Sequence, residues 1–396
     1  MQKTKVINII TRLDTGGSSE LALQVTKGLN HDKFNSILVY GHNPSADYNT
    51  CNVSCIYISH LKRDISPFND IIALIRVLFL FIREKPGIVQ TNSSKAGFIG
   101  RWAAWLYNLI AKAKGEKPAN IVHMPHGHVF YGYGFSRAKT ALFLFLERIS
   151  AKITDKLIAI TSGEKNESLN LRVGKTPQWT IIHPAVECAE IDPLRYRDTI
   201  RHELGISLHT VVVGTVARFE IVKGIIYLIE AAGLVFKHSP DNVRYLLVGD
   251  GSQRNIVEST ARTLGIYDKI IFTGMSENVA QLMSAMDIFV QPSLNEGMGK
   301  TLVQAHSLGL PIIATKVQGI PDIVIEGKSG FLVPPADAAQ LADKILMLVK
   351  NPALRLQMGK TGKNWVTRKE EGLSCFSEER AIKQFENLYD SLIRTH

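Results

Sequence analysis

The stretch MDIFVQPSLNEGMGKTLVQAHSLGLPIIAT, residues 286–315, decides the fold of this chain. Its apolar start predicts a buried strand over residues 287–291. The glycine-spaced turn NEGMG, residues 295–299, leads into a helix that is expected to end near Leu308, before a glycine and a proline. A second apolar run predicts a strand over residues 311–314. A strand, a turn, a helix and a further strand form the repeating unit of a parallel α/β sheet.

The turn is also a candidate ligand site. Backbone N–H groups at the start of a helix bind anions, and the helix dipole favours the same charge. Glu296 lies in the turn, and Gln304 follows about two helical turns later. A carboxylate beside an anion site suits a ligand that carries hydroxyl groups as well as phosphate. This combination predicts a nucleotide sugar.

The same alternation of strands and helices extends over the whole chain and predicts two successive parallel sheets. We expect an α/β fold of two facing, doubly wound, Rossmann-like domains, residues 1–186 and 187–376, with the ligand cleft between them. The apolar stripe near the C-terminus predicts a helix over residues 377–396 that packs back on the first domain. Strands are expected at residues 6–10, 36–40, 87–91, 121–124, 156–160, 180–183, 211–217, 244–248, 270–272, 287–291 and 311–314.

Composition indicates a globular protein rather than a membrane-spanning or disordered chain, with 45% hydrophobic and 21% charged residues in 396. The first residues do not resemble a signal peptide, and no apolar run is long enough to span a membrane. Four scattered cysteines favour reduced thiols in the cytoplasm. Cys51 and Cys55 could form half of a metal site, but no second pair completes it, so no metal is predicted.

The net charge of +10 is unevenly distributed. Residues 1–186 hold 23 Lys and Arg against 12 Asp and Glu, so the surplus lies in the first half. A basic face fits nucleic acid, anionic lipid headgroups or a phosphorylated acceptor, and a merely solvated basic surface is also compatible. Apolar residues at 102–110 and 142–146 are flanked by Lys and Arg, which favours peripheral binding to an anionic membrane.

Two loops of the first half could carry chemistry. Gly16 and Gly17 form a turn at the start of a helix, where the backbone can approach a phosphate or sugar. The second loop follows the strand at residues 121–124 and offers two histidines and aromatic faces that suit a sugar or lipid headgroup, through His126, His128, Tyr131 and Tyr133. Ordinary turns and polar loops are equally compatible with either pattern.

In the second half, successive strands end in residues of the kind that bind a diphosphate. Arg218 and Lys223 supply fixed cations, and Gly249 and Gly274 permit close approach of the backbone. Gly299-Lys300-Thr301 is not a nucleotide-hydrolase loop, because Leu294 stands where that motif needs glycine. No Asp-x-Asp pair is present to hold a metal-bound sugar nucleotide. The two cations could neutralise a leaving diphosphate without metal.

These motifs, taken in order, resemble the retaining glycosyltransferases of family 4, of the type that builds bacterial cell-surface polysaccharides, which have the GT-B fold. The resemblance spans nearly the whole chain. It rests on the loop at Gly16-Gly17, NSSKAGFIGRWAA at 92–104, HMPHGHVFYGYG at 123–134, Arg218 with Lys223-Gly224, VGDG at 248–251, FTG at 272–274, the stretch from 293 to 315, and GIPD and GFLV at 319–333.

The resemblance implies roles for individual residues. Glu296 matches the first acid of the family's two-glutamate motif, which binds the donor sugar, and the backbone of Gly297, Met298 and Gly299 would hold the diphosphate. The second acid, which holds the ribose, falls on Gln304. Gln304 departs from the pattern, because glutamine keeps one acceptor oxygen and adds donors. The resemblance also implies that Arg218 and Lys223 bind the diphosphate, that His126 faces the reacting sugar, and that Gly17 lies near the phosphates.

We therefore expect a metal-independent, retaining hexosyltransferase that needs no cofactor and uses a nucleotide diphosphate sugar as donor. Its acceptor is expected to be a saccharide, in particular a lipid-linked one, at the inner face of the membrane. Two alternatives stay open from the residues alone. One is a nucleic-acid glycosyltransferase of the same fold, which lacks a visible recognition motif. The other is a sugar-nucleotide-binding protein with little turnover, because of Gln304.

Overall fold

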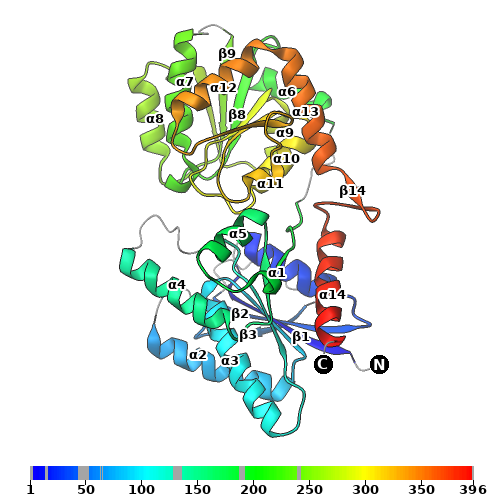
Figure 1. Cartoon of the computed structure of the whole chain (residues 1–396). Coiled ribbons are helices and arrows are strands. Elements are labelled where there is room, and N and C mark those ends of the chain that lie inside the picture. Colours follow the sequence, from blue (N-terminus) through cyan, green and yellow to red (C-terminus); the bar gives the residue numbers. More distant parts are fainter. Residues whose placement is uncertain are drawn as a thin grey trace. The chain divides into compact units, whose positions relative to one another are not determined.

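The computed structural model describes residues 3–13, 17–42, 53–62, 64, 66–127, 136–186, 192–238 and 242–394. The chain divides into two compact units (Figure 1). Unit 1 consists of Met1–Ala185 and Phe376–His396, and unit 2 of Val186–Cys375. Each unit is built on its own parallel sheet with helices on both faces, as expected for two Rossmann-like domains.

In the part of unit 1 that the structure describes, seven parallel strands follow the order β3-β2-β1-β4-β5-β6-β7. The strands are β1 (Thr4–Arg12), β2 (Phe34–His42), β3 (Ser54–Tyr57), β4 (Ile88–Asn92), β5 (Asn120–Met124), β6 (Lys156–Ala159) and β7 (Trp179–Ile181). The helices are α1 (Gly17–Gly28), α2 (Pro67–Glu84), α3 (Ser94–Ala113), α4 (Arg137–Ala151), α5 (Ser162–Asn170), the short 3-10 helix η2 (Thr176–Gln178) and α14 (Glu378–Arg394).

The side chains of β1 alternate between two cores, because successive residues of a strand point to opposite faces. Ile7 and Ile9 pack in one core with Val77 of α2. Ile10 packs on the other face with Ala22 of α1. Both faces of this strand are thus buried, which explains why it reads as a continuous apolar run rather than as an alternating one.

The last helix, α14, belongs to unit 1. It packs against α1, and its Tyr389 hydroxyl donates a hydrogen bond to Oε1 of Gln90 in β4. The Asn30 N–H after α1 donates to Glu386 Oε1 at 2.6 Å. The C-terminal segment is therefore fixed to unit 1 by a buried hydrogen bond to β4, by exposed polar contacts of Asn30 and Lys33 after α1, and by apolar packing.

In unit 2, the described residues form a sheet of six parallel strands in the order β10-β9-β8-β11-β12-β13 and a short antiparallel pair, β14-β15. The strands are β8 (Val211–Val216), β9 (Val243–Val248), β10 (Ile270–Gly274), β11 (Ile288–Gln291), β12 (Ile312–Thr315), β13 (Gly330–Val333), β14 (Lys369–Glu370) and β15 (Leu373–Ser374). The helices are α6 (Pro193–Glu203), η3 (Ile221–Lys223), α7 (Ile225–His238), α8 (Arg254–Thr263), η4 (Tyr267–Lys269), α9 (Val279–Ser284), α10 (Lys300–Ser307), α11 (Ile320–Ile323), α12 (Ala338–Lys350) and α13 (Pro352–Val366).

The largest core of unit 2 lies between one face of the sheet and the helices α7, α8 and α12, whose apolar residues pack against β8, β9 and β11. For the segment after β8, the sequence pattern predicts a helix from Lys223 to about Phe236. The helix instead begins at Ile225, because the chain first forms the 3-10 turn η3 and then passes through Gly224 at φ +62°. No helix within the described ranges is both long and apolar enough to cross a membrane.

Candidate active site

The carboxylate of Glu296 is the centre of a polar cluster at the carboxyl end of β11. Its Oε2 atom lies 2.6 Å from Lys223 Nζ and accepts hydrogen bonds from Gln291 Nε2 at 2.6 Å and Ser293 Oγ at 3.2 Å. The side chains of Lys223 and Glu296 keep 22% and 12% of their surface exposed. The ion pair is thus shielded but open to a ligand.

Two neighbouring loops bring this pair together. The Leu294 N–H donates to the Val222 carbonyl at 2.8 Å, which ties the loop after β11 to η3. Gly224 makes the close approach possible, because a Cβ atom there would lie 2.1 Å from the Pro292 oxygen. Lys223 and Glu296, which are 73 residues apart in the chain, therefore meet because glycine removes a steric barrier.

The turn before α10 holds Glu296 against the helix start. Gly299 is the N-cap residue with φ +76°, and a Cβ atom there would lie 2.8 Å from Leu302 Cδ1 and 3.3 Å from Glu296 Cγ. Met298 is buried, so only its backbone is suited to a ligand. The turn thus places the backbone of residues 297–299 beside a carboxylate.

Gln291 orients the cluster from the last position of β11. Its Oε1 accepts a hydrogen bond from Thr301 Oγ1 at 2.9 Å, so its amide group must direct Nε2 toward Glu296. Sequence analysis missed Gln291, Ser293 and Thr301. A polar residue at the end of an otherwise apolar strand is the signal that could have identified Gln291.

Gln304 lies one turn beyond Thr301 on α10 and is half-buried. Its backbone carbonyl accepts a hydrogen bond from Ser307 Oγ at 2.7 Å, within the helix that Gly299 caps. The position is compatible with a second contact to a ligand held by the turn.

The loops after β8, β9 and β10 form a second group at the same edge. The Gly249 N–H donates to the Gly274 carbonyl at 2.9 Å, and the Phe219 N–H donates to the Asp250 carbonyl at 2.8 Å. Gly249 has φ +133°, and a Cβ atom there would lie 1.9 Å from the Ala217 oxygen. Arg218 projects from this group, and its guanidinium makes no hydrogen bond or ion pair with any residue that the structure describes.

In unit 1, His126 follows β5 with φ +59°, and its Nε2 lies 2.9 Å from Asn92 Oδ1. Asn92 Nδ2 donates to the Ile9 carbonyl at 3.2 Å and to Asn8 Oδ1. These two acceptors fix the orientation of the Asn92 amide, so its oxygen faces the histidine. His126 Nε2 must then carry the proton in this contact.

Other predicted residues of unit 1 are only partly described. Gly17 is the first residue of α1 and is exposed, and Ser19 of the same turn donates through Oγ to the Arg12 carbonyl at 3.0 Å. Gly16, His128, Tyr131 and Tyr133 lie outside the described residues. Asn8 and Asn92 were not among the predicted site residues, although Asn8 interrupts the apolar strand β1 and Asn92 ends β4, which lies beside β1 in the sheet.

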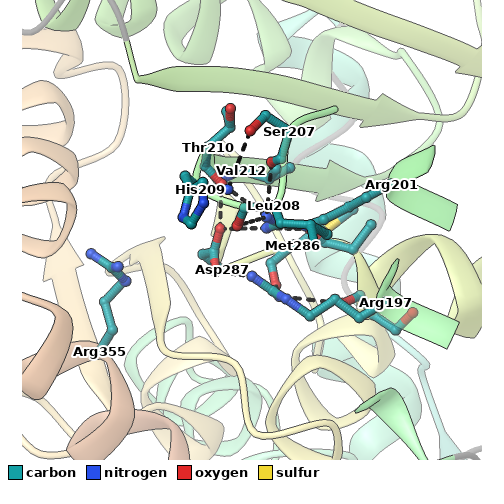
Figure 2. Close-up of polar contacts among 12 residues, drawn as sticks. Arg197, Arg201, Ser207, Leu208, His209, Thr210, Val212, Met286, Asp287 and Arg355 are labelled. Carbon is teal, nitrogen blue, oxygen red and sulfur yellow. Dashed lines mark hydrogen bonds and ion pairs between the residues drawn. The ribbon is translucent and has the colours of Figure 1, made fainter. Parts of the chain in front are cut away.

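The amino end of β11 carries a different polar cluster, which Figure 2 shows. Asp287 accepts hydrogen bonds from Arg197 Nη2, Arg201 Nη2 and the Val212 N–H. Arg201 is fully buried and also donates to the carbonyls of residues 207, 208, 210 and 285. Burial lowers the pKa of Arg201, and the Asp287 carboxylate opposes that shift. Because these groups satisfy one another, the cluster anchors α6 and β11 rather than forming a ligand site.

The chain matches two family models. Residues 15–190 match the model described as Glycosyltransferase Family 4, and residues 196–365 match the model described as Glycosyl transferases group 1. The two matches together span most of the chain and divide it between the two sheets. The chain is thus a glycosyltransferase with a family 4 domain in its first half and a group 1 domain in its second. These matches confirm the resemblance that the sequence motifs indicate.

Bacterial cell-surface enzymes are among the relatives of this glycosyltransferase. It is 25% identical over 396 residues to the Escherichia coli UDP-Gal:alpha-D-GlcNAc-diphosphoundecaprenol alpha-1,3-galactosyltransferase, covering 99% of this chain and 98% of the relative. It is 26% identical over 345 residues to the capsular polysaccharide biosynthesis glycosyltransferase CapM of Staphylococcus aureus, with 85% of each chain covered.

The fold has solved counterparts. The structure of Anabaena HepE in complex with UDP and glucose superimposes with a TM-score of 0.75 at 18% identity, covering 98% of this chain and 100% of the other. At this identity the similarity concerns the fold alone. The glycosyltransferase therefore has the GT-B fold, with two Rossmann-like domains.

Proposed function

We propose that this glycosyltransferase transfers a hexose from a UDP-hexose to a lipid-linked saccharide, with retention of the anomeric configuration. The observation that carries the proposal is the Lys223–Glu296 pair at 2.6 Å beside the N-terminus of α10. A UDP-sugar needs a cation for its diphosphate and an acceptor for its sugar hydroxyls within a few ångströms of each other, and this pair offers both. The full-length similarity to a UDP-galactose-dependent transferase supports uridine as the carrier.

Each charged residue has a distinct part in this proposal. The exposed Arg218 guanidinium can bind two diphosphate oxygens at once. Lys223 supplies a second cation, and the backbone at residues 297–299 adds the dipole of α10. The Glu296 carboxylate, held by Gln291 and Ser293, accepts hydrogen bonds from the sugar hydroxyls.

The reaction needs stabilisation of the departing phosphate. As the bond between the anomeric carbon and the phosphate oxygen breaks, negative charge grows on UDP and positive charge on the sugar ring. Arg218 and Lys223 stabilise UDP without metal. The acceptor oxygen then attacks from the face that UDP leaves, and its proton passes to the leaving phosphate oxygen. We also propose that His126, whose Nε2–H group is held by Asn92, takes part in sugar transfer.

Two substitutions test the assignment of the cations. We expect Arg218→Ala and Lys223→Ala each to lower kcat/KM for sugar transfer roughly 30- to 1,000-fold, about 2–4 kcal/mol, because each removes a charge-assisted contact to the leaving group. Lys350→Ala removes an exposed cation at the end of α12 and serves as the matched control. Near wild-type transfer in both site variants would refute the assignment.

A surface of unit 1 supports a lipid-linked acceptor at a membrane. Helix α2 packs on α3, and α3 packs on α4, so the three form one layer over the sheet (Figure 1). This layer exposes large apolar side chains, namely Phe68, Ile71, Ile75 and Phe79 of α2, Trp105 and Leu109 of α3, and Leu142 and Phe145 of α4. We call it the apolar layer. The sequence pointed to α3 and α4, and α2 adds the most exposed member, Phe68 at 76%.

The apolar layer also carries cations, which an anionic membrane would attract. Lys112 lies in the last turn of α3, with Lys114 and Lys117 directly after it, and Arg137 and Lys139 open α4. Membrane affinity would gain from apolar side chains that enter the headgroup region. It would gain further from flanking cations that pair with lipid phosphates. We infer peripheral attachment to the inner face of the membrane, where a lipid-linked saccharide would be presented.

A further inference from the structure

Glu164 is a buried carboxyl group with both oxygens engaged by backbone donors. It lies in the first turn of α5 with 1% of its surface exposed. Its Oε1 accepts the Gly127 N–H at 2.7 Å, and its Oε2 accepts the Ile160 N–H at 2.7 Å. Burial raises the pKa of Glu164 to about 7, and these two hydrogen bonds oppose the shift. Burying a carboxyl group is costly because the group loses its hydration, so the position of Glu164 needs an explanation.

Capping of α5 does not explain Glu164. Thr161 is the N-cap residue, and its Oγ1 already accepts the Glu164 N–H at 3.3 Å. One carboxylate oxygen of Glu164 accepts the N–H just before the N-cap residue, and the other reaches a different loop, 37 residues earlier in the chain. Its carboxyl group therefore links the strand end at Ile160 to the turn after β5.

That turn has a backbone conformation that requires outside support. His126 has φ +59° and Gly127 has φ +93°, so two consecutive residues are left-handed. The left-handed conformation is unfavourable for a residue other than glycine, such as His126. Among the residues that the structure describes, a Cβ atom at Gly127 would meet nothing within 4 Å. Two contacts hold the turn, namely the Glu164 carboxylate on the Gly127 N–H and the Asn92 amide on the His126 ring.

We propose that Glu164 is a positioning residue for sugar transfer, which holds the Gly127 N–H and thereby keeps the His126 ring on Asn92 in its Nε2–H form. The inference rests on the proposed function in that His126 contributes to transfer. Glutamine cannot replace Glu164, because an amide has one acceptor oxygen and would turn its NH₂ group toward one of the two backbone N–H donors.

Kinetics with Glu164→Gln test the role. We expect kcat to fall at least tenfold while KM for the UDP-hexose stays within twofold, because Arg218, Lys223 and Glu296 are untouched. In a His126→Ala background the same substitution should change kcat less than twofold, because Glu164 acts through His126. Glu167→Gln, a half-buried carboxylate on the same helix, should leave kcat unchanged. An unchanged kcat in Glu164→Gln, or an equal fall in the His126→Ala background, would overturn the proposal.

A spectroscopic readout separates this inference from the transfer reaction. The dipeptide His-Gly occurs once in the sequence, at residues 126–127. Protein labelled with carbonyl-¹³C histidine and ¹⁵N glycine should thus give one cross-peak, the Gly127 amide. In the wild-type chain we expect the Gly127 amide proton to resonate downfield and to exchange slowly, as for an amide hydrogen-bonded to a carboxylate. In Glu164→Gln the resonance should move upfield, and in Glu167→Gln it should stay in place.

The two readouts distinguish the possible failures. A Gly127 amide proton in the wild-type chain with the chemical shift and exchange rate of a solvent-exposed amide would overturn the inference. This measurement does not depend on any variant folding. An unmoved cross-peak in folded Glu164→Gln would also overturn it. If the Gly127 cross-peak moves as expected but the wild-type chain transfers no sugar, the Glu164–Gly127 contact is supported. Only the proposed function is then contradicted.

Discussion

The ion pair between Lys223 and Glu296 illustrates how single residues define this site. The carboxylate receives three donors, from Lys223, Gln291 and Ser293, yet keeps part of its surface exposed. Such a carboxylate is held in one orientation before a ligand arrives, so little side-chain entropy is lost on binding. Preorganised polar groups of this kind contribute most when charge develops in the transition state.

Gln304 is the residue at which the chain departs from the two-glutamate pattern. If its side chain faces the ribose, Gln304→Glu should bind UDP about fivefold more tightly, because hydrogen bonds to a charged acceptor exceed neutral ones by about 1 kcal/mol. Isothermal titration with UDP measures this change. Gln357→Glu, on the exposed face of α13, is the control.

The same variant separates an active enzyme from a sugar-nucleotide-binding protein. An equal or weaker affinity for UDP in Gln304→Glu would show that Gln304 does not contact the ribose. A gain in sugar transfer far beyond the gain in affinity would indicate that the wild-type site has largely lost turnover.

Sequence analysis indicated the charged residues of the candidate site but not the residues that hold site residues in place. Glu296, Lys223 and Arg218 stand out because charged residues follow apolar strands. Asn92 and Glu164 do not, because a polar residue in a strand end or first helical turn is ordinary until its partner is known. Their partners lie 34 and 37 residues away and meet only in the folded sheet.

At the scale of elements, strand β11 connects the site to an anchor. Its carboxyl end carries Gln291, and Asp287 lies just before its amino end. Asp287 binds Arg197 and Arg201 of α6, which comes earlier in the chain than the whole sheet of unit 2 (Figure 2). The cluster thus fixes the strand whose far end carries the Glu296 cluster.

Removing Asp287 should destabilise unit 2 strongly. We expect Asp287→Ala to lower the free energy of unfolding by about 3–5 kcal/mol, because it leaves buried guanidinium groups without their carboxylate. Urea unfolding measures the change. Asp268→Ala removes an exposed carboxylate of unit 2, 74% accessible, and should change stability by less than about 0.5 kcal/mol. Similar small effects in both variants would contradict the anchoring role.

Elements with a clear pattern were predicted, and those without one were not. The unit β11, α10 and β12 follows from an apolar run, a glycine turn and a helix stop, and all three elements are present. Strand β3 was missed, because it is a four-residue edge strand with two exposed residues. The exposed apolar face of α2 was missed as well. The sequence of a helix does not show which of its apolar side chains neighbouring elements will cover.

For the whole molecule, the prediction of two parallel-sheet α/β domains is confirmed, because the alternation of strand and helix patterns restarts halfway along the chain. The basic surplus of the first half has a structural counterpart in the apolar layer and its cations. Charge counting alone could not distinguish a membrane from nucleic acid. The exposed phenylalanine and isoleucine side chains of α2 favour lipid, since they suit a headgroup interface rather than a phosphate backbone.

Vesicle flotation tests the apolar layer. We expect the chain to float with vesicles that contain phosphatidylglycerol and far less with phosphatidylcholine alone, because both cations and apolar groups contribute. The double variant Phe68→Ser with Phe79→Ser should lose most of this binding. The control double variant, Leu194→Ser with Leu356→Ser, removes two exposed apolar side chains from unit 2 and should bind vesicles like wild type. Equal binding by both double variants, or no preference for anionic vesicles, would contradict membrane attachment through this layer.

The stereochemistry of the transfer product tests the central claim most directly. The full-length chain would be incubated with UDP-galactose, UDP-glucose or UDP-N-acetylglucosamine and a short-chain lipid diphosphate that carries α-linked N-acetylglucosamine, with the new linkage assigned by NMR. We expect an α-linked product from one of the three donors, formed by wild type and almost absent with Lys223→Ala. A β-linked product, or transfer that is equally fast without Lys223, would contradict the account.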